Sequence, residues 1–310
     1  MPKLNLKAVI LAAIEAGYGV DAAPTAAANA ILCEPPKLSV LSKKLTRNNT
    51  RAYLGQLAPV NIGQGLKLEF KTEFKGSGVV ATVPEIGVLF RACGYTETIV
   101  PATSVDYDPN SDVFNGESVT IYYYLDGMLH KVAGCRGTFK LAAKVGGYPA
   151  VTWTFTGIYA GPVDQALVTG TYNQTVPPNF VSAAFQLDGY AGVVESLNID
   201  GGNTVTPRAS ANAATGILEY YISARAVAGD CDPEAPGLAT KNFWDMWSNS
   251  NRVALTCDIG QTAGNKCVIT APKVALGDIQ YGDRNGMATL ALPLVFTPNA
   301  GNDEIKFSFQ

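Results

Sequence analysis

The stretch that decides the fold is residues 65–76, GLKLEFKTEFKG, in which apolar and charged side chains alternate. Leucine, phenylalanine and threonine fall on the even positions, whereas lysine and glutamate fall on the odd ones. Because successive side chains of a β-strand point to opposite faces, this pattern predicts a half-buried antiparallel strand. The charged face suits a solvated or pairing surface better than a ligand pocket, since its signs alternate along Lys67, Glu69, Lys71, Glu73 and Lys75.

One helix and a hairpin follow this strand. Residues 84–94 begin with proline and end with glycine, which predicts a short helix. Residues 118–124 (SVTIYYY) predict a strand and run into Asp126-Gly127, a strong hairpin-turn signal. A second strand is therefore expected past His130, and the first half of the chain is predicted to be strand-rich with one helix.

The second half repeats this order of elements, although its sequence identity to the first half is low. The counterparts are residues 216–225 for the 65–76 strand, 238–247 for the helix, 252–257 for 118–124, 266–274 for 134–145, and 287–296 for 151–159. Residues 160–180 contain Gly-Pro and Pro-Pro, which predicts a crossover linker between the halves. A doubled architecture accounts for a length of 310 residues.

Composition excludes several classes of protein. Charged residues make up 16% and hydrophobic residues 47%, so a disordered chain is excluded. A net charge of −3 argues against binding nucleic acid through the whole surface. The apolar run at residues 8–14 ends at Glu15 and is far too short to span a membrane, so no membrane anchor is expected.

Charge is distributed unevenly between the halves. Residues 1–159 hold fifteen basic and twelve acidic side chains, a net charge of +3, and residues 160–310 hold eight and fourteen, a net charge of −6. The basic excess is concentrated in a stretch without an acid, which contains Lys37, Lys43, Lys44, Arg47 and Arg51. This stretch is either a solvated face or a surface that meets the acidic half of a neighbouring copy.

Nothing in the sequence indicates catalysis or a cofactor. His130 is the only histidine, and its setting predicts an exposed loop position. The six cysteines, at positions 33, 93, 135, 231, 257 and 267, form no CxxC pair and favour reduced thiols in a cytosolic compartment. We therefore assign no catalytic, cofactor-binding or metal-binding residue, and we expect no cofactor and no enzymatic activity.

Several segments, taken together and in order, resemble the major tail tube proteins of long-tailed (siphovirus-type) bacteriophages, here in a tandem-duplicated form. The segments are residues 11–25 (LAAIEAGYGVDAAPT), 29–32 (NAIL), 51–55 (RAYLG), the strand ending at 76, 84–95 (PEIGVLFRACGY), 118–124 (SVTIYYY) and 152–157 (TWTFTG). The resemblance covers residues 8–160 well and the second half mainly by pattern.

The resemblance implies a mainly β fold of two tandem β-sandwich or β-barrel domains, each with one short flanking helix. The expected division is an N-terminal arm at 1–35, a first tail-tube-like domain at 36–160, a linker at 161–180 and a second domain at 181–310. Residues 1–60 are rich in alanine and proline without a sustained strand pattern, so they are expected to contain an arm that reaches an adjacent ring or subunit.

For function, the resemblance implies a structural virion protein whose hairpins join those of its neighbours in closed rings. The rings stack into the hollow tube that conducts phage DNA during ejection. Single-domain members form sixfold rings, so a doubled chain is expected to form trimeric, pseudo-sixfold rings. The implied partners are other copies of the chain, a tape measure protein in the lumen, and tail terminator and distal tail proteins at the ends. DNA is expected to pass without specific binding, and the tail to be assembled in the host bacterial cytoplasm.

Two alternatives remain at this level. One is a tube protein of a contractile secretion system, which is usually a shorter single domain. The other is a carbohydrate-binding or adhesive β-sandwich module of a tail tip. A carbohydrate platform would use exposed aromatic rings such as Tyr122, Tyr123 and Tyr124, whereas packing on both faces of a strand is the simpler role for this run.

Overall fold

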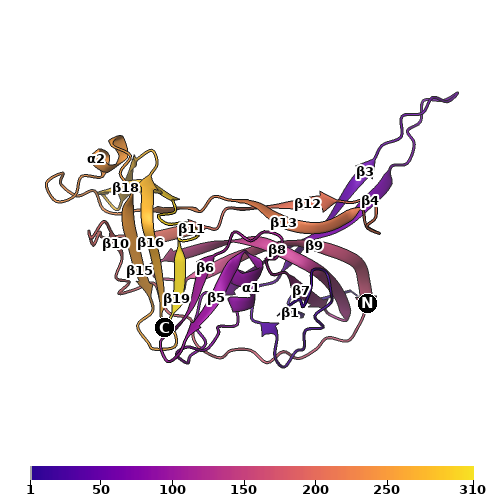
Figure 1. The fold of residues 1–310 in the computed structure, drawn as a ribbon, viewed down its shortest axis with the longest axis horizontal. Helices are drawn as coiled ribbons and strands as arrows, with labels where there is room; N and C mark the ends of the chain where they lie inside the picture. The colour runs from indigo at the N-terminus through magenta and orange to yellow at the C-terminus, as the bar shows by residue number, and fades with distance from the viewer. Residues whose placement is uncertain (1) are drawn as a thin grey trace.

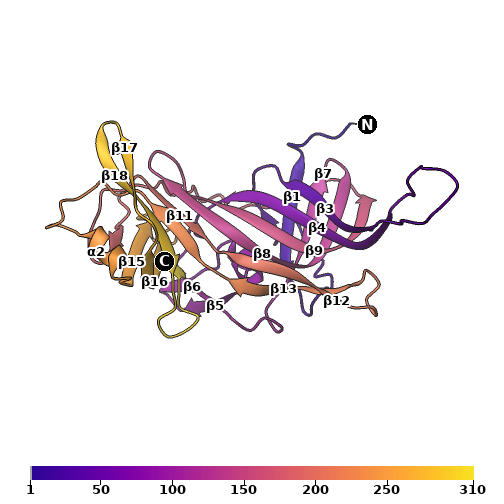
Figure 2. The ribbon, with the colours of Figure 1, turned by 90° about the horizontal axis from the view of Figure 1, so that it is seen from above.

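The computed structural model describes residues 2–310 and consists mainly of antiparallel strands, with two short helices (Figures 1 and 2). This confirms the predicted mainly β fold. The elements of the first half are β1 (Ala8–Ile14), β2 (Ala30–Ile31), β3 (Lys37–Leu45), β4 (Val60–Glu73), α1 (Gly87–Ala92), β5 (Tyr95–Val100), β6 (Ser104–Pro109), β7 (Val119–Leu125), β8 (Met128–Lys144) and β9 (Ala150–Asp164).

The second half contains shorter strands and one helix. They are β10 (Gln186–Leu187), β11 (Ser196–Asp200), β12 (Asn203–Ala209), β13 (Ile217–Arg225), β14 (Ala228–Cys231), α2 (Phe243–Ser248), β15 (Val253–Ile259), β16 (Cys267–Leu276), β17 (Gln280–Arg284), β18 (Met287–Phe296) and β19 (Lys306–Phe309).

The strands of the first half pair in the order β1-β7-β8-β9-β4-β3, all antiparallel. Leu66, Leu68 and Phe70 of β4 are buried, and the charged positions between them are more exposed, as the alternation predicted. The hairpin at Asp126-Gly127 joins β7 to β8, and β8 pairs with β9 across a turn at Gly146-Gly147.

The strands of the second half pair in the order β10-β15-β16-β18-β14-β11. The helix α2 lies between β14 and β15 in the chain, as α1 lies between β4 and β7. The long strands β8 and β9 of the first half each correspond to two shorter strands in the second half. β16 and β17 together correspond to β8, and β18 and β19 together correspond to β9. β17 pairs with the start of β18, and β19 pairs with the start of β16. The same order of pairing therefore occurs twice.

Each half also carries a long hairpin that leaves its sheet. In the second half β11 continues into β12, and β13 continues into β14, so the hairpin β12–β13 is an extension of the β11–β14 pair. It runs across β8 and β9 of the first half (Figure 1). The hairpin β3–β4 of the first half projects away from the body (Figure 1).

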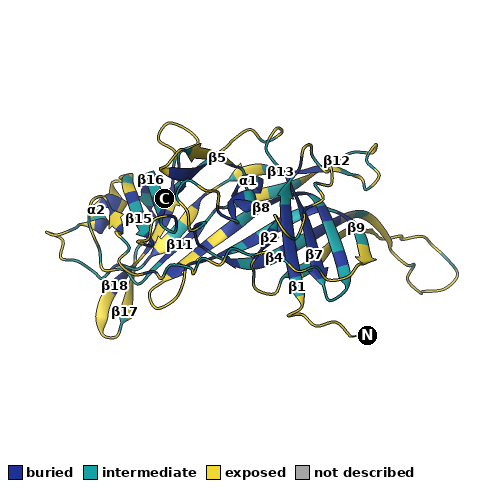
Figure 3. Ribbon diagram, turned by 90° about the horizontal axis from the view of Figure 1, so that it is seen from below, coloured by how far each residue is buried: buried dark blue, intermediate teal, exposed yellow. Residues whose placement is uncertain are grey.

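Both halves share one hydrophobic core. Phe90 of α1 packs against Trp153 of the first half and against Phe307 and Phe309 of β19, with ring centroids 5.0, 5.1 and 6.5 Å away. The buried residues lie along the body of the molecule, and the projecting hairpin is exposed (Figure 3). Because these aromatic rings come from both halves, the two sheets are held together by a common core as well as by the chain segment between them.

The prediction that residues 1–60 lack a sustained strand was wrong, because they contain β1 and β3. β1 is apolar at every position since both of its faces are covered: Ile10 and Ala12 belong to the main core, while Val9 and Leu11 pack in a second cluster with Tyr122 and Tyr124. β3 lies at a sheet edge and is largely exposed, and its apolar residues are not confined to one face.

Two further details differ from the sequence predictions. The second helix begins at Phe243 rather than at residue 238, because the Asn242 side chain caps it by accepting a hydrogen bond from the Asp245 N–H at 3.0 Å. The segment 266–274 pairs with β15 as the first part of β8 pairs with β7, so it matches residues 128–135 rather than 134–145. The division at residues 35, 160 and 180 stays a prediction.

Candidate assembly surfaces

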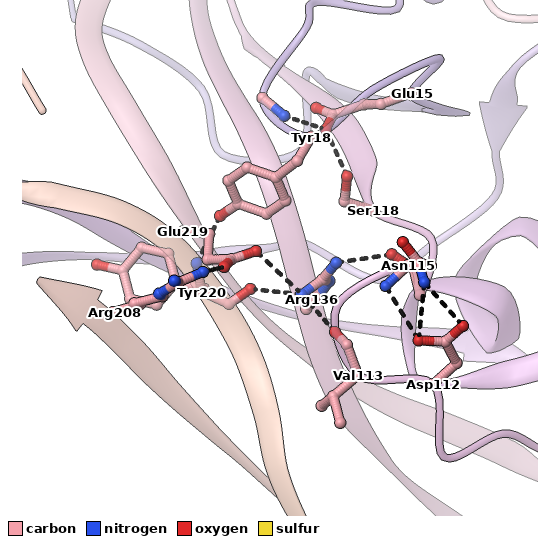
Figure 4. A network of polar contacts seen from close by, with 12 residues as sticks. Glu15, Tyr18, Asp112, Val113, Asn115, Ser118, Arg136, Arg208, Glu219 and Tyr220 are labelled. Carbon is pink, nitrogen blue, oxygen red and sulfur yellow. Dashed lines mark hydrogen bonds and ion pairs between the residues drawn. The ribbon is translucent and has the colours of Figure 1, made fainter. Parts of the chain in front are cut away.

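The joint between the hairpin β12–β13 and the first half is a buried polar network (Figure 4). Tyr18, in the loop after β1, accepts a hydrogen bond at 2.6 Å from the N–H of Tyr220 on β13. Arg136 of β8 donates a hydrogen bond to the carbonyl of Tyr220 at 3.1 Å, and its guanidinium lies 3.8 Å from the carboxylate of Glu219. Burial raises the pKa of Tyr18 and lowers that of Arg136.

Glu15 anchors the first-half side of this network. Its buried carboxylate accepts hydrogen bonds from the Ser118 and Thr120 hydroxyls at 2.6 and 2.7 Å. It also accepts two backbone hydrogen bonds, from Gly19 and Gly134, each at 2.7 Å. This residue therefore ties β1, β7 and β8 together next to Tyr18, and it is a structural carboxylate with its acceptor capacity filled.

The base of the second hairpin is joined to the first half by strand pairing. Ser196–Asp200 of β11 pairs antiparallel with residues 144–140 of β8, and it pairs with β14 on its other edge. Ion pairs flank this contact: Lys140 lies 2.8 Å from Asp200, and Lys144 lies 3.1 Å from Glu195. In this contact the hairpin side is acidic and the body side is basic.

A third connection joins β19 to β6. Phe307 and Phe309 of β19 pair with Tyr107 and Val105 of β6. Beside them, the Asp106 carboxylate accepts a hydrogen bond from the Ser308 hydroxyl at 2.6 Å and lies 2.7 Å from the Lys306 ammonium. Although desolvation raises the pKa of Asp106, these hydrogen bonds and the lysine charge lower it overall.

The hairpin β3–β4 presents an open edge. Within residues 2–310, β3 pairs with β4 alone, so its other edge carries free backbone donors and acceptors. Large apolar side chains of the hairpin are exposed, among them Val40 on β3 at 61% and Tyr53 in the loop between the two strands at 67%. The side chains of Lys43, Lys44 and Arg47 are exposed beside them. Such an edge is a template for pairing with another strand.

A second open edge lies in β17. Among the described residues, its strand pairing is to β18 alone. Tyr281 of β17 is 69% exposed, and the carboxylates of Asp278 and Asp283 at this edge are also exposed. The only basic residue of the strand, Arg284, is directed to Glu195 and Asp232 at 3.1 and 2.8 Å. This edge is therefore acidic where the edge of β3 is basic.

The residues singled out from the sequence lie mostly in packed positions. His130 is in β8, half-buried rather than in an exposed loop, and its ring stacks between Tyr123 and Tyr159, with Nδ1 2.6 Å from the Tyr159 hydroxyl. Burial lowers its pKa. The sequence predicted a loop at this position because His130 follows the Asp-Gly turn so closely.

The tyrosine run and the cysteines have structural roles. Tyr122, Tyr123 and Tyr124 are all buried, and alternate rings enter the two clusters on opposite faces of β7, as the packing interpretation predicted. All six cysteines are free thiols, which confirms the prediction of reduced cysteines. Burial raises the pKa of these thiols, to about 12 for Cys33 and Cys257.

Open strand edges of opposite charge, on halves that are already joined by a strand contact, characterise a structural subunit built for association with other chains. A family model described as phage tail tube protein matches residues 5–298. The chain belongs to the phage tail tube protein family. No curated protein matches it. Within residues 2–310, no helix has the length and apolar character needed to cross a bilayer.

Proposed function

We propose that this protein is a major tail tube subunit, which self-assembles into stacked rings that form the hollow conduit for phage DNA ejection. Family membership supports the tail tube role. The observation that carries the ring is the pair of open edges on β3 and β17. A contact between two different edges repeats head to tail, and a head-to-tail contact closes into a ring when its rotation permits.

The ring contains three chains in this proposal. The order β1-β7-β8-β9-β4-β3 recurs as β10-β15-β16-β18-β14-β11, so each chain supplies two similar sheets. We propose that these correspond to tandem units at 36–160 and 181–310, joined by the segment 161–180. Three chains then supply six sheets around the lumen, which gives pseudo-sixfold symmetry.

The remaining partners follow from the tail tube role. We propose that a tape measure protein fills the lumen during assembly, and that terminator and distal tail proteins bind the ends of the tube. DNA passes without specific binding in this scheme, because the chain has a net charge of −3 and phosphate binding requires clustered basic groups. The carbohydrate-binding alternative lacks its platform, since the Tyr122–Tyr124 rings are buried.

Electron microscopy of the purified full-length protein tests this proposal. We expect rings or stacked tubes in negative stain, and class averages with threefold symmetry in which six similar densities surround a lumen. Native mass measurement of the ring should give three chains. Monomers at every concentration tested would refute assembly by the chain itself, and rings of six chains would refute the trimer.

A further inference from the structure

The contact between the two halves shows how one hairpin base of this chain is received by a sheet. β11 is the outer strand of the second half, and it continues the sheet of the first half by pairing with the distal end of β8. On the buried face of this contact, Ile199 lies opposite Leu141, and both are about 1% exposed. The joint therefore combines backbone pairing with apolar burial.

The open edges of β3 and β17 are the counterparts of these two strands. β3 borders β4 as β11 borders β14, and β4 borders β9 as β14 borders β18. β17 pairs with the start of β18 as the distal end of β8 pairs with the start of β9. Each open edge thus corresponds to a strand of the other half that is already paired within the chain. The edge of β3 corresponds to that of β11, and the edge of β17 corresponds to that of the distal end of β8.

These relationships also give a register. Phe70 of β4 pairs with Trp153, and Cys231 of β14 pairs with Leu292. If the buried side chains of these two pairs are superposed, the β11 segment 196–200 corresponds to residues 35–39, of which 37–39 belong to β3 and Pro35 and Pro36 precede it. The segment 140–144 corresponds to Gln280–Arg284 by the same superposition. Leu38 then faces Tyr281, as Ile199 faces Leu141.

We infer that β3 of one chain pairs antiparallel with β17 of the next chain, with Ser39 opposite Gln280, and that this strand contact closes the ring. The inference rests on the proposed function and specifies its interface. The occupant of each open edge is a second copy of this chain. Along their other edges, β3 stays paired with β4 and β17 stays paired with β18.

Charge supports a second copy as the partner. Inside the chain, the acidic hairpin base meets basic positions, in the pairs Asp200–Lys140 and Glu195–Lys144. At the proposed contact the signs are exchanged: the hairpin carries Lys37, Lys43 and Lys44, whereas the receiving edge carries Asp278 and Asp283. Opposite charges favour this pairing, and like charges disfavour pairing of β3 with the basic end of β8.

Apolar exposure agrees with the same contact. The internal hairpin β12–β13 lies against β8 and β9. The equivalent placement of the hairpin β3–β4 brings its exposed Val40 and Leu45 toward β16 and β18 of the next chain, where Val295 is 47% exposed. Covering these side chains removes apolar surface from water, which stabilises association.

Cysteine cross-linking tests the contact and its register. We use the double variant Ser39→Cys/Gln280→Cys in the full-length protein and a short bifunctional maleimide as the probe. The expected products are covalent dimers and trimers, with no species larger than one ring at low protein concentration. Both positions are exposed, so the substitutions leave the core intact, which circular dichroism verifies.

Two matched variants serve as controls. Lys140→Cys/Asp200→Cys joins positions that are paired within the chain, so it should react within the monomer. Ser39→Cys/Lys140→Cys keeps the same hairpin position but offers the strand whose edge is already occupied, so it should give no covalent multimers. Cross-linking of this control as efficiently as the test variant would overturn the inference.

The outcomes separate the interface from the function. Threefold rings in the microscope without a Ser39→Cys/Gln280→Cys cross-link would overturn the β3–β17 contact and leave the tube proposal standing. Absence of rings at any concentration would overturn both. Rings together with interchain products, and with none from the Ser39→Cys/Lys140→Cys control, are the supporting result.

Discussion

The Tyr18 hydroxyl accepts a hydrogen bond of 2.6 Å from the backbone N–H of Tyr220, two residues that lie 202 positions apart in the chain. This bond fixes the second hairpin on the first half at a part-buried point, where Tyr18 is half-buried and Tyr220 is buried. We expect Tyr18→Phe to lower the free energy of unfolding by about 1–3 kcal/mol, because the Tyr220 N–H is left without a partner. Urea denaturation measures the loss, and hydrogen exchange should accelerate in β13 more than in β9. Unchanged exchange in β13 would contradict this role.

Glu15 is predicted to matter for stability through its four hydrogen bonds. Glu15→Gln replaces one acceptor oxygen by a donor that faces other donors, so a loss of about 2–3 kcal/mol is expected. Glu34→Gln is the matched control, since Glu34 pairs with Lys71 at the surface and such pairs contribute at most about 1 kcal/mol. Thermal and chemical denaturation of the two variants compare the losses. Equal losses would show that the Glu15 network is dispensable.

The charge pattern at the two open edges predicts a rescue. Lys43→Glu/Lys44→Glu should raise the concentration required for assembly by about tenfold, equal to about 1.4 kcal/mol, because two cations on the strand that approaches the acidic edge, close to Asp278, then become anions. Asp278→Lys/Asp283→Lys in the same chain should restore assembly. Light scattering against protein concentration measures both effects, and they should shrink in high salt. Failure of the rescue would place the lysines in a different contact.

Asp106 predicts a pH dependence of stability. Its pKa is lowered in the folded state, so its stabilising contribution is fully present above the ordinary value of 3.8 and is lost as the pH falls through the folded pKa. Asp106→Asn should cost about 1–2 kcal/mol at pH 7, and the difference from the parent protein should shrink below about pH 3.8. Denaturation at several pH values tests this. A constant difference would show that the Asp106 charge is irrelevant.

Truncation distinguishes the start of the chain from β1. Removal of residues 2–7 should leave the fold intact, because these residues precede β1 and are exposed. Removal of residues 2–14 should prevent folding, since β1 pairs along its whole length with β7 and buries Ile10 and Leu11. Solubility and circular dichroism of the two products give the result. A folded product of the longer truncation would show that β1 is replaceable.

The sequence predicted best the elements whose two faces differ. β4 has one buried and one more exposed face, so its alternation was legible, and β7 was marked by the Asp-Gly turn that follows it. β1 was missed because both of its faces are buried, and β3 because much of it is exposed. In both strands the residue pattern carries no period of two from which a strand could be recognised.

The assembly surfaces were only partly predictable. The basic stretch from Lys37 to Arg51 was visible as charge without an acid, and a meeting with an acidic neighbour was one of its two interpretations. The open edge of β17 was not visible in the sequence, because whether an edge is open depends on which strands pair in the folded chain. Likewise, Tyr18 and Tyr220 are distant in sequence, and no local signal joins a loop tyrosine to a backbone N–H in another half.

The position of Phe90 among the rings of Phe307 and Phe309 has a consequence for the order of events during synthesis. The two partners emerge from the ribosome more than two hundred residues after Phe90. Contacts so distant in sequence form slowly. The aromatic surface around Phe90 in the nascent first half therefore stays exposed until β19 has been synthesised. Chaperones can bind this surface during that interval.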